Sequence, residues 1–198
     1  MIQIIFLIIF TRWKVTADLD NSKIRKFLAG FDSEPNTARK GKQLEDLTCY
    51  IMEGISGVKL EGRNVYDKYF DQEIDLIVLN DLTLSGLYFL PSIIAFECKN
   101  LAEPVSKNEI ILFARKLKNK GITLGIVVAR SGVTGKESKG TYAYGEIQRT
   151  LHEGCKILVI TGQDLEKITN TSQVMTMLKD KVCNLVIQVR INLRRNKI

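Results

Sequence analysis

Three charged residues interrupt two apolar stretches of this 198-residue sequence. Asp75 lies in the first stretch, Glu-Ile-Asp-Leu-Ile-Val-Leu-Asn, and Glu97 and Lys99 lie in the second, Ile-Ile-Ala-Phe-Glu-Cys-Lys-Asn. Both stretches have the composition of β-strands. An ionised side chain in such a strand lowers stability substantially unless it is paired, bound to a metal or placed at an open edge. These three residues are therefore candidates for a functional site.

The three residues converge if the two strands pair as a hairpin. Side chains alternate between the faces of a strand, so Glu97 and Lys99 share one face and Cys98 points to the other. Asp75 on the neighbouring strand then adds a second carboxylate. Two carboxylates beside an ammonium form a site for Mg²⁺ or Mn²⁺ and a polarised water. We expect Lys99 to stay protonated beside these carboxylates, where it would orient the water and stabilise transition-state charge.

The surrounding sequence predicts the elements that hold these strands. The connector at 81–91 contains Gly86 and Pro91, which favour a turn. Because apolar residues fill almost every position of both stretches, we expect strands that are covered on both faces. Helical and strand-like patterns alternate around them, which is typical of an α/β protein. The predicted neighbours are a helix over 37–55, a strand over 58–66, a helix that begins with the capping box at 106–109, and a buried strand over 122–129.

These residues resemble the signature of a known family. Asp75 followed by Glu97-Cys98-Lys99 resembles the D…(D/E)xK motif of the PD-(D/E)XK, or restriction-endonuclease-like, nuclease superfamily. The order of the predicted elements is most similar to that of Mrr-like type IV restriction endonucleases, over about residues 38–168. One departure is Ile74, which stands where the motif name has proline.

The resemblance implies a fold, an activity and two further site components. The implied fold is α/β, a restriction-endonuclease-like core in which a central mixed β-sheet is flanked by helices in the order αβββαβ. The implied activity is that of a Mg²⁺-dependent (or Mn²⁺-dependent) endonuclease that hydrolyses phosphodiester bonds, with double-stranded DNA as the expected partner, in restriction, defence or repair. It adds Glu45, as the family's helix glutamate, and the backbone carbonyl of Cys98 as a metal ligand. Without the resemblance, a solvated helix glutamate is the simpler interpretation of Glu45.

Composition narrows the class of function. Lys and Arg number 29 against 22 for Asp and Glu, and the net charge of +7 suits a polyanionic partner without requiring one. The four cysteines have no CxxC spacing, which argues against a zinc site or a disulfide framework and favours a reducing, cytoplasmic location. The single histidine, His152, excludes sites that need paired or clustered imidazoles.

Two segments are candidates for phosphate contacts. The loop Arg-Ser-Gly-Val-Thr-Gly-Lys at 130–136 is not a Walker A loop, because it lacks the first glycine and the Ser or Thr after its lysine. Its amides, Ser131 and Lys136 are still candidates to bind phosphates, and a plain turn is the alternative. Near the C-terminus, Arg194 and Arg195 either contact phosphates or stay solvated.

The ends of the chain lie outside the region of resemblance. We expect an N-terminal extension over 1–37, the nuclease domain over 38–168, and a C-terminal helix with a basic strand and tail over 169–198. The strand is predicted because apolar and polar residues alternate at 185–193. Residues 1–10 are almost wholly apolar but are about half the ~20 residues that span a bilayer, so membrane association is not expected.

The two apolar end segments leave further interpretations open. A membrane-surface anchor and a buried core segment are alternatives for the first ten residues. Both end segments are also candidates for an interface, and we expect a homodimer because one active site cuts one strand of a duplex.

Two other interpretations of the central residues remain open. One is a catalytically inactive nucleic-acid-binding protein with the same fold, which the complete set of Asp75, Glu97 and Lys99 argues against. The other is purely structural, with Glu97 and Lys99 as the solvent-facing end of a strand.

Overall fold

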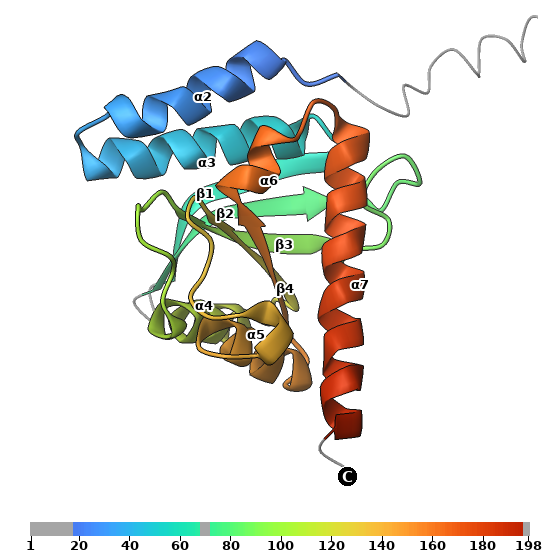
Figure 1. Cartoon of the computed structure of the whole chain (residues 1–198). Coiled ribbons are helices and arrows are strands. Elements are labelled where there is room, and N and C mark those ends of the chain that lie inside the picture. The colour runs from blue at the N-terminus through green and yellow to red at the C-terminus, as the bar shows by residue number, and fades with distance from the viewer. Residues whose placement is uncertain (1–17, 68–71, 196–198) are drawn as a thin grey trace, which may run out of the picture.

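The computed structural model describes residues 18–67 and 72–195. Within these residues the chain forms a five-stranded mixed sheet with the order β1-β2-β3-β4-β5 (Figure 1). β1, β2 and β3 are antiparallel neighbours, whereas β3, β4 and β5 are parallel. The strands are β1 (Val58–Asp67), β2 (Gln72–Asn80), β3 (Ile93–Lys99), β4 (Leu124–Ala129) and β5 (Lys156–Thr161).

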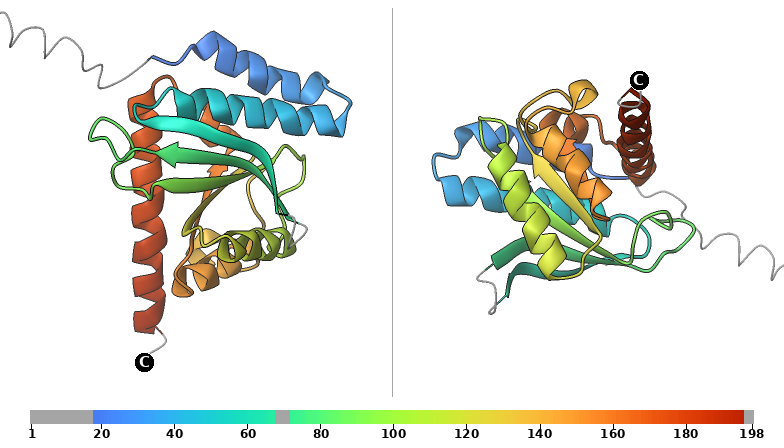
Figure 2. Two further views of the ribbon diagram at one scale, coloured as in Figure 1. Left: turned by 180° about the vertical axis from the view of Figure 1, so that it is seen from behind. Right: turned by 90° about the horizontal axis from the view of Figure 1, so that it is seen from below.

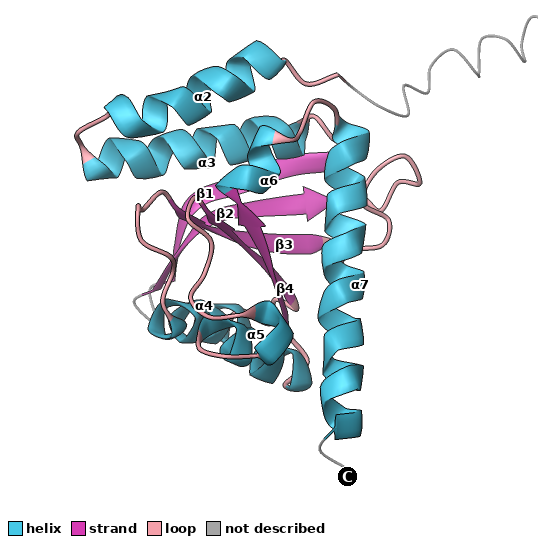
Figure 3. Cartoon of the chain, in the orientation of Figure 1, coloured by secondary structure: helices cyan, strands magenta, loops and turns pink. Residues whose placement is uncertain are grey.

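Helices flank this sheet on both sides (Figures 1 and 3). They are α2 (Asn21–Ser33), α3 (Thr37–Glu53), α4 (Lys107–Asn119), the 3₁₀ turn η1 (Glu137–Lys139), α5 (Ala143–His152), α6 (Gly162–Glu166) and α7 (Thr171–Arg195). α2 stacks on α3, and α3 packs against β1, β2 and β3. α4 and α5 lie on the other side of the sheet, as Figure 2 shows. The predicted α/β class with a central mixed sheet is confirmed.

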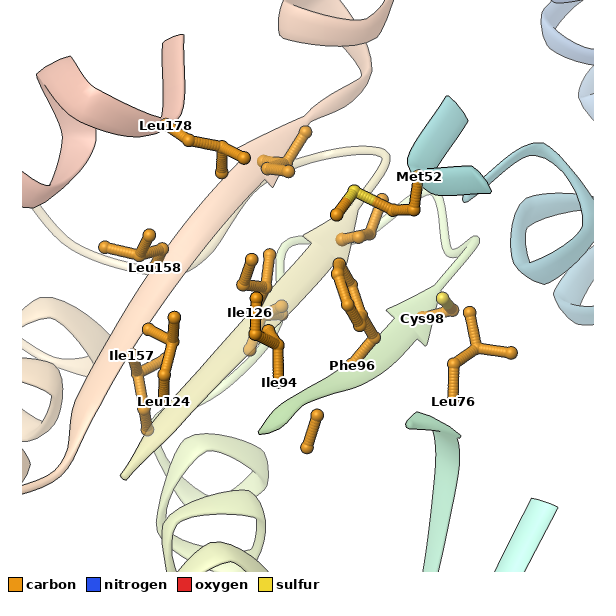
Figure 4. Close-up of a cluster of buried hydrophobic side chains, with 14 of the residues drawn as sticks. Met52, Leu76, Ile94, Phe96, Cys98, Leu124, Ile126, Ile157, Leu158 and Leu178 are labelled. Carbon is orange, nitrogen blue, oxygen red and sulfur yellow. The ribbon is translucent and has the colours of Figure 1, made fainter. Parts of the chain in front are cut away.

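The buried core joins helices and strands that are distant in the sequence. Met52 of α3 and Leu178 of α7 pack into one cluster with Phe96, Ile126 and Leu158 of three adjoining strands (Figure 4). Parallel strands with helices on both faces need apolar residues at almost every position, and β4 is buried along its whole length. The core therefore lies on both sides of β3 and β4.

The prediction that both central strands are covered on both faces is correct for β3 and wrong for β2. β3 is buried from Ile94 to Cys98. Burial alternates along β2, where Leu76 and Val78 are buried and Asp75 and Ile77 are half-buried. β2 is next to the edge strand β1, and α4 contacts it only in part. One face of β2 is therefore partly open, and Asp75 lies on that face.

The C-terminal strand predicted over 185–193 is also wrong, because α7 runs without a break from Thr171 to Arg195. Leu178, Val182 and Leu185 follow one another at helical spacing, and Leu178 and Leu185 are buried. The sequence has no Gly or Pro after Gly162 to end the helix. A helix that has already begun extends at little cost, whereas a new strand would need a pairing partner.

The described end segments pack on the same core as the sheet. Leu19 and Ile24 belong to the buried cluster, and the amide of Leu19 donates to the carbonyl of Thr169 at 3.2 Å. The apolar segment at 1–10, with the anchor and interface roles considered for it, lies outside the described residues. Among those that are described, no helix combines the length and the apolar character needed to cross a bilayer.

Candidate active site

Asp75, Glu97 and Lys99 meet on one face of the β2–β3 hairpin. The two strands are antiparallel, with Leu76 opposite Phe96, and this register places Asp75 beside the Glu-Cys-Lys segment. A carboxylate oxygen of Asp75 accepts a hydrogen bond from the amide of Cys98 at 2.6 Å. The ammonium of Lys99 lies 3.0 Å from Oε1 of Glu97. The predicted hairpin and the predicted pairing of Glu97 with Lys99 on one face are therefore confirmed.

Glu97 is not at a solvent-facing strand end. Its exposed fraction is 7%, and the side chain of Lys99 is 29% exposed. A carboxylate at this depth requires a charged partner, because burial removes its hydration. The purely structural interpretation of a solvated strand end is therefore wrong for Glu97.

A second lysine, which the sequence did not reveal, completes the site. The ammonium of Lys116 on α4 donates to both oxygens of Glu97, at 3.2 Å to Oε1 and 2.8 Å to Oε2. Lys116 stands between Phe113 and Leu117, which are buried on the apolar face of α4. The sequence does show a lysine at the border of the apolar face of this helix. Solvated lysines commonly occupy the same position, so the pattern alone does not predict a contact with Glu97.

Two local features set the position of α4. Its first turn is the predicted capping box, in which Glu109 Oε2 accepts from the amide of Ser106 at 2.8 Å. The helix then packs closely on β4, because a Cβ at Gly125 would lie 2.5 Å from Leu117 and 2.6 Å from Phe113. The absence of a side chain at Gly125 lets α4 approach the sheet closely, near the position from which Lys116 contacts Glu97.

Burial and charge change the proton affinities within this cluster. Burial and then the negative charge of Glu97 raise the pKa of Asp75 from 3.8 to about 6. Burial alone would lower the pKa of Lys99, but the charge of Glu97 and the hydrogen bond to it raise the net value above 10.5. This direction agrees with the expectation that Lys99 stays protonated at neutral pH.

Among the described residues, Glu45 makes no hydrogen bond or ion pair with Asp75, Glu97 or Lys99. Glu45 lies on α3, and the hydroxyl of Thr48 on the same helix is 3.7 Å from the Cys98 sulfur. Cys98 points away from Glu97 and Lys99, so α3 covers the opposite face of the sheet. Burial raises the pKa of Glu45, and its charge has only a minor effect on the pKa of Asp75.

The expected phosphate-contacting residues lie in two places. Ser131 is exposed. It lies next to the end of β3, because the amide of the preceding residue, Arg130, donates to the Lys99 carbonyl at 3.0 Å. The Ser131 hydroxyl already donates to the Leu101 carbonyl at 2.8 Å. Lys136 is exposed farther along the same loop. Arg194 and Arg195 end α7 instead of a strand, and their side chains lie outside the described part of the structure.

The donor set fits a magnesium ion. No group of three or more Asp, Glu, His or Cys side chains suited to a metal occurs within 18–67 and 72–195. Mg²⁺ does not need one, because it commonly binds one or two carboxylates and keeps several waters. Asp75 and Glu97 provide two hard oxygen donors. The pKa of Asp75 is raised by burial and then by the charge of Glu97, and a bound cation would oppose both effects. The carbonyl of Cys98 stays an expected ligand.

No family model, no curated protein and no solved structure matches this chain. The function is therefore inferred from the site itself.

Proposed function

We propose that this protein is a divalent-metal-dependent nuclease that hydrolyses phosphodiester bonds of nucleic acid, with double-stranded DNA as the expected substrate. The observation that carries the proposal is the placement of Asp75 and Glu97 on adjoining antiparallel strands, with Lys99 3.0 Å from Glu97. The order from α3 to β4, a helix, three strands, a helix and a strand, supports a restriction-endonuclease-like core. A role in restriction, defence or repair would follow from such an activity.

Each member of the site has a distinct task in this proposal. Asp75 and Glu97 would hold Mg²⁺ or Mn²⁺, which supplies Lewis-acid activation of water and of the phosphate. Lys99 is cationic and partly exposed, so it would bind a phosphate oxygen and stabilise the charge that grows there. The hydrogen bond from Cys98 fixes the carboxylate of Asp75 against β3. The orientation of Asp75 as a metal ligand is thus set by a backbone amide and not by another side chain.

One of the segments expected to contact DNA lies next to the site. The loop that carries Ser131 is tied to the end of β3 through the Lys99 and Leu101 carbonyls. Lys136 and the basic end of α7 would add sequence-independent phosphate contacts, consistent with the net charge of +7. Since one such site cuts one strand, cleavage of both strands in one binding event would need two copies, and a homodimer remains the expected assembly.

The alternative function is nucleic-acid binding without catalysis. The observation that favours it is the saturation of Glu97, whose two oxygens are both occupied by lysine ammoniums. An inactive protein would bind DNA independently of Asp75 and would not respond to divalent cations.

A plasmid-cleavage assay separates the two functions. Supercoiled plasmid, linear duplex and single-stranded DNA are incubated with the protein in Mg²⁺, Mn²⁺ or EDTA. We expect metal-dependent nicking or cutting that is lost in Asp75→Asn and in Glu97→Gln. The matched control is Glu61→Gln, which removes the carboxylate of an exposed ion pair with Lys59 on β1. Cleavage that persists in EDTA or in Glu97→Gln would refute the proposal.

A further inference from the structure

Glu97 is shared between two ammonium groups, and the closer engagement is with Lys116. Lys99 contacts one carboxylate oxygen, at 3.0 Å. Lys116 contacts both, at 3.2 and 2.8 Å. Its side chain is 18% exposed, less than the 29% of Lys99. Lys116 therefore contacts both of the oxygens that Glu97 could offer to a metal ion.

A metal ion bound to Glu97 would lie close to the ammonium of Lys116, which contacts both oxygens of that carboxylate. Magnesium binds oxygen at about 2.0–2.1 Å, and the ammonium nitrogen of Lys116 is 2.8 and 3.2 Å from the same two oxygens. Two cations at such close range repel each other strongly where little water separates them. Binding of a divalent ion to Glu97 therefore favours a position of the Lys116 ammonium farther from this carboxylate.

The charges of the site support the same conclusion. Two carboxylates, Asp75 and Glu97, face two ammoniums, Lys99 and Lys116, so the metal-free site is neutral. A divalent ion added to this arrangement leaves two excess positive charges. A phosphate group that enters the site offsets part of that excess, and an ammonium released from Glu97 is then available to bind it.

We propose that Lys116 is an internal counter-ion that holds Glu97 in the metal-free protein and is displaced by the divalent cation. The proposal rests on the proposed function, since the metal site at Asp75 and Glu97 is part of it. Lys116 is then a positioning residue that lowers metal affinity while nucleic acid is absent. Removal of its charge should tighten metal binding, which is the opposite of what removal of a metal ligand does.

The test is calorimetric titration of the metal-free, full-length protein with Mn²⁺, without nucleic acid. We expect Lys116→Met to bind Mn²⁺ at least about tenfold more tightly than the wild type, because one nearby like charge is removed. Lys116→Arg retains the charge and should bind no more tightly than the wild type. The control is Lys118→Met on the same helix, which removes a lysine paired with Glu153 at the surface and should change nothing. Unchanged or weaker binding by Lys116→Met would overturn the proposal.

A measurement on the wild-type chain covers the case in which Lys116→Met does not fold. The side-chain nitrogen of Lys116 is followed by NMR, with its signal assigned through Lys116→Arg, as Mg²⁺ is added. We expect the signal of the ion-paired ammonium to disappear, and a signal that persists in saturating Mg²⁺ would overturn the proposal.

The cleavage assay separates failure of this inference from failure of the proposed function. If the wild type cleaves DNA with Mg²⁺ while Lys116→Met gains no Mn²⁺ affinity, only the role of Lys116 is wrong. If neither protein binds Mn²⁺, both the role of Lys116 and the metal site are wrong.

Discussion

The carboxylate of Asp75 accepts a hydrogen bond of 2.6 Å from the amide of Cys98, the residue between Glu97 and Lys99. This bond links a side chain of β2 to the backbone of β3, next to the paired residues Leu76 and Phe96. It also presents an N–H dipole to a carboxylate whose pKa is raised by burial and by Glu97. The hydrogen bond therefore fixes the position of the Asp75 carboxylate. Whether the carboxylate carries a proton depends on the pH and on any cation bound beside it.

The first prediction concerns the stability of the metal-free protein between pH 4 and pH 6. The pKa of Asp75 is raised in the folded state to about 6, so the folded protein binds this proton more tightly than the unfolded chain does. The stabilisation is complete below the ordinary value of 3.8 and is lost as pH rises through about 6. At pH 7 Asp75→Asn should therefore be more stable than the wild type in EDTA, by up to roughly 3 kcal/mol and by less where solvent screens the charge.

Urea denaturation across this pH range measures the effect. The difference in unfolding free energy between the wild type and Asp75→Asn should grow as pH rises from 4 to 7. Two parallel curves would show that the pKa of Asp75 is not raised in the folded protein.

The second prediction concerns Asp75, Glu97 and Lys99 as one catalytic unit. Asp75→Asn, Glu97→Gln and Lys99→Met should each lower the cleavage rate by roughly 10²-fold or more, because the two carboxylates would hold the metal ion and Lys99 would stabilise the charge on the phosphate. The triple variant should lose little more than the worst single variant, since members of a unit are not additive. Single-turnover cleavage rates, with folding checked by circular dichroism, decide the point. Full activity in Lys99→Met would contradict the assignment.

The third prediction compares two glycines whose surroundings differ. Gly125→Ala should destabilise the protein by about 1–3 kcal/mol, because its Cβ would overlap Leu117 and Phe113 of α4. Gly41→Ala on α3 meets nothing within 4 Å, and it should stabilise the protein by up to about 1 kcal/mol through helix propensity. Thermal unfolding of both variants checks this. Equal effects of the two substitutions would show that α4 is not packed closely on β4.

The fourth prediction concerns the basic end of the chain. If Arg194, Arg195 and Lys197 contact duplex phosphates, replacing all three with Ala should reduce the slope of log affinity against log salt by up to about three, at ~0.9 per phosphate. Fluorescence anisotropy with a labelled duplex in EDTA measures the slope. The control replaces Arg25 and Lys26, which are exposed on α2. An unchanged slope in the triple variant would show that these three residues do not contact DNA phosphates.

Much of the fold follows from local sequence patterns. A period of two places Glu97 and Lys99 on one face of a strand whatever surrounds it, and the capping box at Ser106 and Glu109 begins α4 as predicted. The all-apolar segment at Leu124–Ala129 likewise predicts a strand buried on both faces. These features depend on residues a few positions apart, which is why the sequence determined them.

Packing between elements decided the rest. The choice between a helix and a strand at 185–195 depended on whether the sheet offered a partner, because a continuing helix satisfies its own hydrogen bonds. Glu45 stands on α3, which covers the face of the sheet opposite Glu97. Lys116 belongs to the cluster because α4 packs on the same face as Glu97. The face that each helix covers depends on contacts between residues far apart in the chain, so only the tertiary structure decided which charges meet at Glu97.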